Sequence, residues 1–259
     1  MDINEEMAAH SLDRAACTPS NLVGNQHIQV DMDYYQLFDM ERELSTLMSR
    51  VKIGEMIDEA TMPFKELMAY YKCAMMQVET KFNVLNENFS LGHDCNPIAH
   101  IKTRLKSPRS ILEKMSRYGV PMTTQGIEEG IQDIAGVRVV CNYLSDIYEL
   151  ADALLRQDDV TLVERKDYIR NPKPNGYRSL HLIISTPIFL HDKKRMMKVE
   201  VQLRTLAMDT WASQEHQIRY KKDSGATDRS FGEELLQCAD MCARVDEIMD
   251  TVHQYSKQC

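Results

Sequence analysis

The sequence predicts an α+β protein with a mixed β-sheet of about four to five strands, helices packed on one face and a concave polar face opposite. Apolar residues recur at helical spacing from residue 34 to 86 and again from 231 to 255. Between these stretches, strand-like runs alternate with short helical runs from 133 to 204. Helices that flank a block of strands are typical of a helix-covered sheet.

The run from about 196 to 204 gives the clearest strand pattern. Val199, Val201 and Leu203 alternate with polar residues along it. Because the apolar side must pack on helices, we expect Glu200 to point to the polar face. The other strands are expected at 134–141, 160–169 and 179–185.

The chain before the strands is expected to hold two helices. The first follows Tyr34, and the second begins after Thr61, a suitable N-cap, with Pro63 in its first turn and its end near Asn86. The stretch from Phe89 to about His100 is expected to be irregular. The predicted organisation is a flexible tail over 1–30, a helical extension over 31–60, a main domain over 61–222 and a C-terminal helix over 223–259.

Two helices carry apolar stripes whose burial can be predicted. In the second helix the spacing alternates strictly between four and three, which suits packing within the domain or against another subunit, and we favour the domain. In the last helix we expect the apolar residues to point inward. The first stripe is Phe64, Met68, Tyr71, Met75, Val78, Phe82 and Leu85, and the second is Leu235, Cys238, Met241, Cys242, Val245, Ile248 and Val252.

The charge distribution argues against a general nucleic-acid binder, because the chain carries a formal net charge of −8. Two local stretches are nevertheless strongly basic. Such islands in an acidic chain suit small polyanions better than a long duplex. Their cations are Lys102, Arg104, Lys106, Arg109, Lys114 and Arg117 in the first, and Arg165, Lys166, Arg170, Lys173 and Arg178 in the second.

The seven cysteines form no C-x-x-C pair, so we expect reduced thiols and no structural metal site. The first ten residues are acidic and polar, unlike a signal peptide, and the sequence has no apolar run of membrane-spanning length. We therefore expect a cytoplasmic protein that binds neither membrane nor DNA.

The segment from Asn171 to His181 reads N-P-K-P-N-G-Y-R-S-L-H. Its two prolines fix φ and remove amide donors, which excludes a helix or a central strand. The dipeptide Asn175-Gly176 supplies the positive φ of a tight reversal before a strand. A stiff loop at a strand entrance therefore presents Lys173 and Tyr177, which are suited to phosphate binding and base stacking.

A short helix is expected after Ser107, a suitable N-cap, with Pro108 at its first position and Gly119 just past its end. Its polar residues Ser110, Lys114 and Arg117 are spaced four and three apart and share one face. They could be a solvated surface, but they lie near a helix N-terminus, which favours anions.

Asp133 opens one predicted strand and Glu200 lies on the polar face of another, so both are candidates for a shared divalent cation. Mg²⁺ takes one or two carboxylates and completes its shell with water and substrate phosphates. Nearby cations could hold a triphosphate and stack on bases. Spacing alone cannot establish that the two acids converge, but these groups match those of phosphoryl transfer.

Five motifs then stand in an order that resembles the synthetase domain of the RelA/SpoT family, over roughly residues 61–222. They are R-L-K at 104–106 with Ser110 and Lys114, D-I-A-G-V-R at 133–138, K-D-Y-I at 166–169, the segment 171–181, and E-V-Q-L-R-T at 200–205. The chain is similar to a small alarmone synthetase of the RelQ type, with a nucleotidyltransferase-like fold. The resemblance implies transfer of the β,γ-pyrophosphate of ATP to the ribose 3′-OH of GDP or GTP, which yields ppGpp or pppGpp and AMP.

Carried over by position, the resemblance implies roles for individual residues. Asp133 would bind Mg²⁺, and Glu200 would bind it too or act as the base toward the 3′-OH. Asp209 falls where relatives often carry Asn facing guanine. The implied ATP-binding residues are Arg104, Lys106, Ser110, Lys114, Arg117 and Arg138, and the implied GDP/GTP-binding residues are Lys166, Lys173, Asn175, Tyr177, His181 and Asp209.

The sequence leaves two alternatives open: a toxin-like relative that modifies adenine nucleotides or tRNA, and an inactive nucleotide- or RNA-binding regulator. The pairs His93-Asp94 and His191-Asp192 resemble the His-Asp pair of the family's hydrolase, but we expect no hydrolysis. We expect Trp211, Tyr70 and Tyr71 in the core and a structural role for His216. Relatives are commonly homotetramers with an allosteric alarmone site, and alarmone or single-stranded RNA could bind here. The preference among GMP, GDP and GTP stays open.

Overall fold

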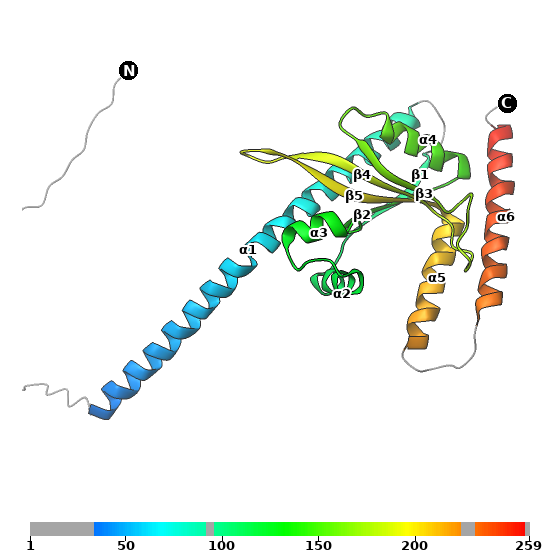
Figure 1. Ribbon diagram of the computed structural model, residues 1–259. Helices are drawn as coiled ribbons and strands as arrows, with labels where there is room; N and C mark the ends of the chain where they lie inside the picture. Colours follow the sequence, from blue (N-terminus) through cyan, green and yellow to red (C-terminus); the bar gives the residue numbers. More distant parts are fainter. Residues whose placement is uncertain (1–33, 92–95, 224–230, 257–259) are drawn as a thin grey trace, which may run out of the picture. The chain divides into compact units, whose positions relative to one another are not determined.

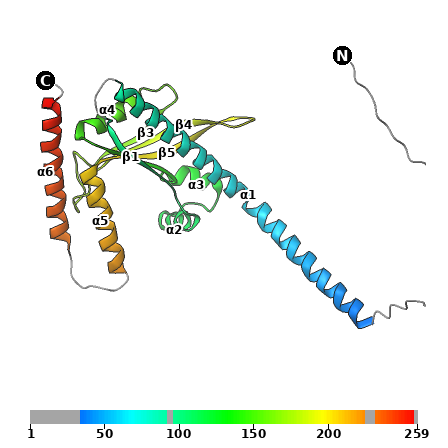
Figure 2. The ribbon, with the colours of Figure 1, turned by 180° about the vertical axis from the view of Figure 1, so that it is seen from behind.

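The computed structural model describes residues 34–91, 96–223 and 231–256, and the chain divides into two compact units, residues 1–55 and 56–259. The tail predicted over 1–30 lies outside the described residues, as does the pair His93-Asp94. Figures 1 and 2 show the arrangement of the elements of the second unit from opposite sides. No helix within the described residues combines the length and apolarity needed to cross a membrane.

The five strands of the described residues form one mixed sheet in the order β1-β2-β5-β4-β3. Strands β2 and β5 run parallel, and the other neighbouring pairs are antiparallel. This confirms the predicted fold class. The bounds are β1 Ile98–Leu105, β2 Ala135–Cys141, β3 Thr161–Asp167, β4 Leu180–Phe189 and β5 Lys194–Thr205.

The described helices are α1 Tyr34–Ser90, α2 Pro108–Tyr118, α3 Thr124–Gly130, α4 Leu144–Leu155, α5 Leu206–Asp223 and α6 Gly232–Ser256. Helix α2 begins and ends as predicted. The side chain of Ser107 accepts a hydrogen bond from the amide of Ser110, and Pro108 occupies the first turn. The helix ends at Gly119, whose φ of 65° is the left-handed conformation that glycine adopts without steric cost.

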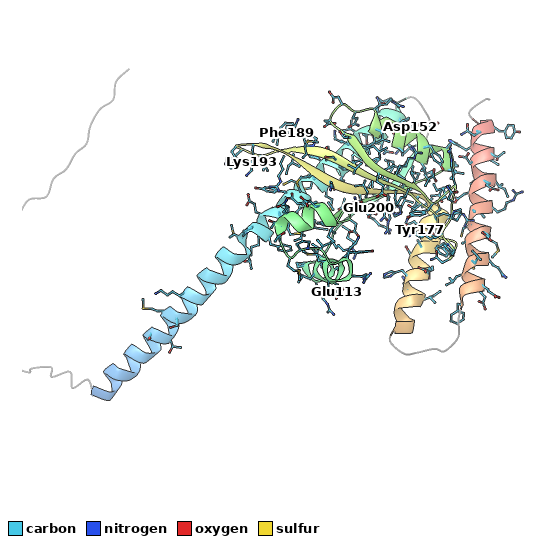
Figure 3. The ribbon with its side chains drawn as sticks, in the orientation of Figure 1. Glu113, Asp152, Tyr177, Phe189, Lys193 and Glu200 are labelled. Carbon is cyan, nitrogen blue, oxygen red and sulfur yellow. The ribbon has the colours of Figure 1, made fainter. Side chains whose placement is uncertain are left out.

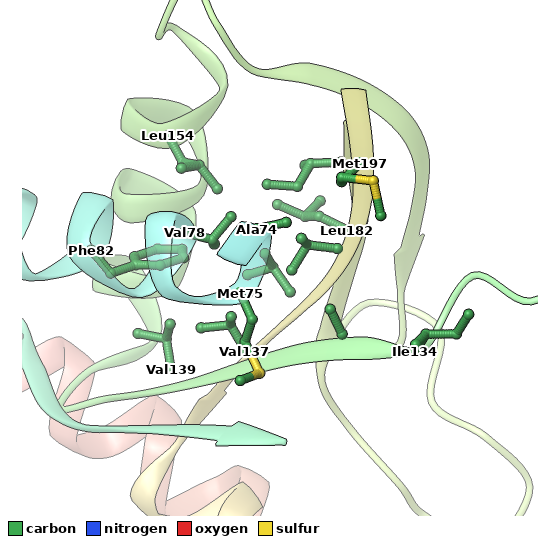
Figure 4. Packing of buried hydrophobic residues seen from close by; sticks show 14 of the residues in the cluster. Ala74, Met75, Val78, Phe82, Ile134, Val137, Val139, Leu154, Leu182 and Met197 are labelled. Carbon is green, nitrogen blue, oxygen red and sulfur yellow. The ribbon is translucent and has the colours of Figure 1, made fainter. Parts of the chain in front are cut away.

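The apolar face of the sheet packs against α1 and α4 (Figure 4). Val78 and Phe82 of α1 are fully buried there together with Val139 of β2 and Leu182 of β4. The predicted apolar stripe of residues 64–85 therefore packs within the domain, because all its members are buried or pack against this core. Burial of a large aliphatic or aromatic side chain contributes about 1.5–3 kcal/mol.

The prediction of two separate N-terminal helices is wrong. Thr61 is not an N-cap, since it lies inside α1, and Pro63 is an internal residue of the same helix. Proline removes a single helical hydrogen bond and disfavours a helical residue before it. Good helix formers on both sides continue the helix past it.

Strand β1 is an element that the sequence analysis missed. It covers residues expected to be irregular or to lead directly into α2, and its partly buried residues Ile101, Thr103 and Leu105 alternate with exposed Lys102 and Arg104. This two-residue period was present in the sequence. The strand pairs with β2, which places Lys102 opposite Arg138.

The orientation of α6 also differs from the prediction. The apolar stripe predicted that Met241, Val245, Ile248 and Val252 point inward, but between half and two-thirds of each side chain is exposed. The inward side is set by polar contacts. Its buried residues include Asp246, which accepts a hydrogen bond of 2.7 Å from Thr205. A hydrogen-bonded polar face thus replaces the apolar one.

Candidate active site

The polar face of the sheet forms the floor of an open cavity of about 720 Å³, which is within the range of small-molecule sites. Strands β1, β2 and β5 supply most of its floor, while Tyr177 and helix α5 supply the walls. The cavity brings together residues of four predicted motifs that are far apart in the sequence. These are Arg104 and Lys106, Asp133 and Arg138, Tyr177, and Glu200.

Asp133 precedes β2 and lies between two lysines. Its carboxylate accepts hydrogen bonds from Lys106 Nζ at 2.9 Å and from Lys114 Nζ at 2.8 Å. Burial raises the pKa of Asp133, but these two cations outweigh burial and hold its pKa below the ordinary value. The carboxylate is therefore ionised, as a metal ligand requires.

Glu200 lies on β5 (Figure 3) and lines the same cavity. Its Oε1 lies 3.2 Å from His181 Nδ1, and its Oε2 accepts a hydrogen bond of 2.9 Å from Gln202. Burial raises the pKa of Glu200, whereas the contacts with His181 and Gln202 lower it, and the net shift is downward. The charge of Asp133 acts in the opposite direction and raises this pKa.

Tyr177 is held on the loop before β4 by contacts on its hydroxyl and its ring. Arg204 donates a hydrogen bond of 2.5 Å to the hydroxyl oxygen, and His181 Nε2 lies 2.8 Å from the same oxygen. Because a guanidinium can only donate, the tyrosine proton is available to His181 Nε2. In a neutral imidazole this leaves Nδ1 protonated and able to donate to Glu200. A chain of hydrogen bonds then runs from Arg204 through Tyr177 and His181 to Glu200.

Cations and aromatic rings surround the loop. Lys173 Nζ lies 4.6 Å from the ring centroid of Tyr168 and 5.0 Å from that of Tyr177. The ring of Tyr168 also meets His181 edge-on at 5.3 Å. Tyr168 belongs to the K-D-Y-I motif but was not among the predicted site residues. Its ring contacts Tyr177 and His181 edge-on, the two aromatic groups that the resemblance assigned to the acceptor.

Asp209 at the start of α5 is almost completely buried among cations. Its Oδ1 lies 3.2 Å from both Arg138 and Arg204, and its Oδ2 lies 3.3 Å from Lys102. Burial raises the pKa of Asp209, but the three cations hold it below the ordinary value. Both of its oxygens are thus committed to positioning these side chains.

The turn of the loop is fixed by helices α5 and α6. Asn175 donates a hydrogen bond of 3.2 Å to Glu215 of α5. Gly176 has φ of 87°, and an added Cβ would lie 2.6 Å from the Cβ of Ala239 on α6. The guanidinium of Arg178 donates to the carbonyls of Gly176 and Ala239. Tyr177 is therefore flanked by residues that anchor the backbone on both sides.

Three predicted residues lie away from the contacts described above. Lys166 is exposed and pairs with Glu164 at 2.9 Å, although it senses the charge of Glu200. Arg117 is exposed on α2. The hydroxyl of Ser110 lies 3.0 Å from that of Ser107 at the start of α2. Their roles toward ATP and the acceptor stay predictions.

The structure also adds residues to the site that the sequence analysis did not assign. Gln202 and Arg204 lie on the cavity floor because they share the alternation of Glu200 along β5, and this pattern could have identified them. Glu215 and His216 line the cavity from α5. His216 is exposed and faces the cavity, whereas a structural role was expected. Trp211, Tyr70 and Tyr71 are buried, as predicted.

The sheet and its cavity define a protein that binds polyanions beside a pair of ionised carboxylates. Residues 103–225 match the region found in RelA/SpoT proteins. The chain is 44% identical over 186 residues to the GTP pyrophosphokinase YwaC of Bacillus subtilis, which covers 72% of this chain and 88% of that protein. It is 34% identical over 182 residues to the GTP pyrophosphokinase YjbM of the same organism, with coverage of 70% and 84%.

Solved structures agree with these matches. Small alarmone synthetase 2 from B. subtilis superimposes with a TM-score of 0.67 at 41% identity, over 74% of this chain and 98% of that one. Small alarmone synthetase 1 from B. subtilis, bound to its product pppGpp, superimposes with the same TM-score at 32% identity, over 74% and 97%. The chain therefore belongs to the RelA/SpoT family and, within it, to the small alarmone synthetases.

Proposed function

We propose that the chain is a GTP pyrophosphokinase that transfers the β,γ-pyrophosphate of ATP to the 3′-OH of GDP or GTP and releases AMP. The observation that carries this proposal is the presence of Asp133 and Glu200 on one cavity, surrounded by cations from β1, β2, β5 and α2. Binding alone would not require two ionised carboxylates in a site built for phosphates. The named activities of the relatives support the same reaction.

ATP is assigned to the side of the cavity formed by β1, β2 and α2. Arg104 and Arg138 have planar cationic groups that stack on an adenine ring. Lys106 and Lys114 contact Asp133, and we assign both to the neutralisation of the ATP phosphates. Ser110 and Arg117 are assigned to the same phosphates by family resemblance.

GDP or GTP is assigned to the side formed by the loop before β4. Tyr177 would stack on guanine, and its hydroxyl is already held by Arg204 and His181. Lys173 and Lys166 would contact the acceptor's phosphates. His181 and Asn175 complete this group, and the assignment of Asp209 to guanine stays a prediction.

Glu200 is the proposed base toward the acceptor's 3′-OH. In the reaction, the 3′-oxygen forms a bond to the β-phosphorus of ATP, and the bond from that phosphorus to the α,β-bridging oxygen breaks. The bridging oxygen leaves with AMP, and the hydroxyl proton passes to the Glu200 carboxylate. The hydrogen bond with His181 Nδ1 orients that carboxylate, as a third group orients the base in other catalytic sets.

Mg²⁺ fits this site by the chemistry of its donors. Asp133 and Glu200 supply ionised oxygens on one cavity, and one or two carboxylates with phosphates and water suit this ion. Asp133 would be its principal ligand, and Glu200 could serve as ligand, base or both. When bound, the ion would neutralise charge on the pyrophosphoryl group.

Self-association is a further part of the proposal. The exposed apolar residues Met241, Val245, Ile248 and Val252 on α6 support an oligomer, for which the resemblance predicts a homotetramer. Light scattering coupled to size-exclusion chromatography measures the mass. A mass near four chains is expected, while a monomer at micromolar concentration would contradict this part. A cytoplasmic location and an allosteric alarmone or RNA site stay predictions.

The reaction is tested by incubating purified protein with Mg²⁺, ATP labelled at the γ-phosphate, and one of GMP, GDP, GTP or ATP as acceptor. Ion-exchange chromatography should reveal labelled ppGpp from GDP or pppGpp from GTP, with one AMP released for each product formed. Equal product with ATP as acceptor would indicate the toxin-like alternative. No product with any acceptor would indicate a binding protein without catalysis.

A further inference from the structure

The short segment that carries Asp133 depends on tertiary contacts for its position. Helix α3 spans only seven residues, Thr124–Gly130, and a helix of this length is not stable by itself in water. Asp133 comes three residues after the helix ends. The contacts that hold α3 therefore also set where the Asp133 carboxylate lies.

Two cations of β5 hold Glu128 of α3. Arg195 Nη2 donates a hydrogen bond of 2.5 Å to Glu128 Oε1, and Lys198 Nζ donates one of 3.2 Å to the Glu128 carbonyl. Glu128 lies in the last turn of the helix, where a cation interacts favourably with the carbonyl end of the helix dipole. Figure 1 shows α3 next to β5, as these contacts require. The strand that carries Glu200 therefore holds α3 by its side chain and by its backbone.

The pair of Arg195 and Glu128 differs from an ordinary surface ion pair. Only about one third of each side chain is exposed, and the guanidinium carbon of Arg195 lies 4.7 Å from the ring centroid of Tyr70 on α1. Tyr70 is itself buried. Ion pairs between freely moving surface side chains contribute little, whereas this arginine is fixed over a buried ring. Arg195 therefore joins α1, α3 and β5 at one point.

The segment is fixed on the other side of Asp133 as well. The amide of Lys106, which follows β1, donates a hydrogen bond of 2.8 Å to the carbonyl of Ile134. Ile131 and Ile134 flank the aspartate and are fully buried, but apolar packing is not directional. The hydrogen-bonded anchors at Glu128 and at Ile134 therefore set the direction in which the carboxylate points.

We propose that Arg195 and Lys198 are positioning residues for Asp133. Both act through Glu128, and they hold the aspartate at a fixed distance from Glu200. Because Lys198 and Glu200 are two residues apart on one strand, a shift of α3 against β5 would move one carboxylate relative to the other. This inference rests on the proposed function, in which Asp133 holds Mg²⁺ beside Glu200. Removal of a partner that orients a metal ligand typically lowers metal affinity or activity about 10- to 100-fold.

The test measures metal binding and kinetics in Arg195→Gln with the full chain. Mn²⁺ alone is the probe, and electron paramagnetic resonance follows its free fraction without any turnover. We expect the Kd for Mn²⁺ to rise about tenfold and kcat to fall about tenfold, while the KM for GTP stays within about twofold. Lys193→Gln is the matched control, because Lys193 precedes the same strand and also faces Tyr70, at 5.7 Å, but pairs with Glu66. It should match the wild type.

A second set of variants separates positioning from a general loss of structure. Glu128→Ala, alone or combined with Arg195→Gln, should match the single arginine variant within about twofold, because all three lose the same contact. Lys198→Met, which keeps the length of the side chain, should show the same pattern of losses. Arg195→Lys retains a charged donor and should recover most of kcat. If Arg195→Gln is unfolded by circular dichroism, Glu128→Ala and Arg195→Lys replace it.

The outcomes distinguish this inference from the proposed reaction. A wild-type Kd for Mn²⁺ in Arg195→Gln or in Lys198→Met would overturn the role of that residue, and losses that add in the double variant would overturn its action through Glu128. If the wild type binds Mn²⁺ but makes no alarmone, the proposed reaction fails, and the Kd values of the variants still decide the inference. A wild-type chain that binds no Mn²⁺ would also overturn the inference, since Asp133 would then have no metal to hold.

Discussion

The imidazole of His181 joins Tyr177 to Glu200: its Nε2 lies 2.8 Å from the tyrosine hydroxyl and its Nδ1 lies 3.2 Å from Oε1 of the glutamate. The residue predicted to stack on the acceptor base is thereby linked to the residue predicted to accept the proton. Arg204 on the cavity floor donates a hydrogen bond to the same tyrosine hydroxyl. The side chains proposed for base stacking and for proton transfer therefore belong to one hydrogen-bonded network.

This relationship predicts different effects for two substitutions of His181. Asn at this position retains an amide donor near the place of Nδ1, whereas Ala removes both contacts. We expect kcat to fall about 10- to 100-fold in His181→Ala, since a hydrogen bond to a charged group contributes about 1.5–3 kcal/mol, and less in His181→Asn. Steady-state kinetics with GTP measures both. Equal losses in the two variants would contradict the orienting role of Nδ1.

Lys114 is predicted to act on ATP and on the ionisation of Asp133. Lys114→Gln removes a contact of 2.8 Å with that carboxylate, so the KM for ATP should rise about tenfold, as expected for one charged contact. The pKa of Asp133 should move up toward its usual value, which shifts the acidic limb of the pH–rate profile to higher pH. Arg109→Gln is the matched control, because Arg109 lies on the same helix, is exposed and pairs with Glu113. Identical profiles for both variants would contradict the assignment.

Arg178 is predicted to be a positioning residue for the acceptor loop. Its side chain is mostly buried, and its guanidinium joins the loop to the Ala239 carbonyl and to Asp240 at 3.0 Å. Arg178→Ala should raise the KM for GTP about tenfold and leave the KM for ATP within about twofold. Arg244→Ala, an exposed arginine of α6 that pairs with Glu247, is the control. Parallel losses for both substrates would indicate general unfolding instead.

The fluorescence of Trp211 provides a second measurement for the Arg178→Ala prediction. It is the single tryptophan of the chain, and its Nε1 donates to the Leu235 carbonyl of α6 at 2.7 Å. Its fluorescence therefore reports on the packing of α5 against α6. We expect the Arg178→Ala spectrum to match the wild type, since Thr205 and Asp246 still hold the helix. A red-shifted spectrum would show that α6 itself had detached.

Asp246 should make stability depend on pH in an unusual direction. Burial raises the pKa of this carboxyl to about 6. The folded state then binds the proton more tightly than the unfolded chain, so stability falls as pH rises from about 4 to about 6. Asp246→Asn keeps an acceptor for Thr205 without a buried charge. It should be more stable than the wild type at pH 7.5, with the difference lost near pH 4.

Urea titrations followed by circular dichroism at several pH values measure this difference. Asp240→Asn is the control on the same helix, because most of the Asp240 side chain is exposed. It should show no such crossover between pH 4 and pH 7.5. A variant Asp246→Asn that is less stable than the wild type at every pH would contradict the prediction.

Much of the fold followed from local patterns. The cap at Ser107, the stop at Gly119 and the alternation around Glu200 each depend on residues close in sequence, and each prediction agrees with the structure. The position of Pro63 inside α1 and the orientation of α6 did not follow from local patterns. Whether a proline begins a helix or lies within it depends on residues before it, and an apolar stripe does not reveal which face finds hydrogen-bonding partners.

The site was predictable in its members but not in their contacts. Motif order pointed to Asp133 and Glu200, and the register of β2 with β5, which pairs Gly136 with Glu200, brings them onto one cavity. Two of the salt bridges of Asp209 depend on residues more than 70 positions away, Arg138 and Lys102. No spacing in the sequence encodes these two contacts.

The central claim is that Glu200 serves the acceptor hydroxyl, and Glu200→Gln tests it most directly. Calorimetry should show an unchanged affinity for GDP, while labelled product from ATP and GTP falls by at least about a thousandfold, as expected when a catalytic base is lost. Product formation near the wild-type rate in Glu200→Gln would contradict the account.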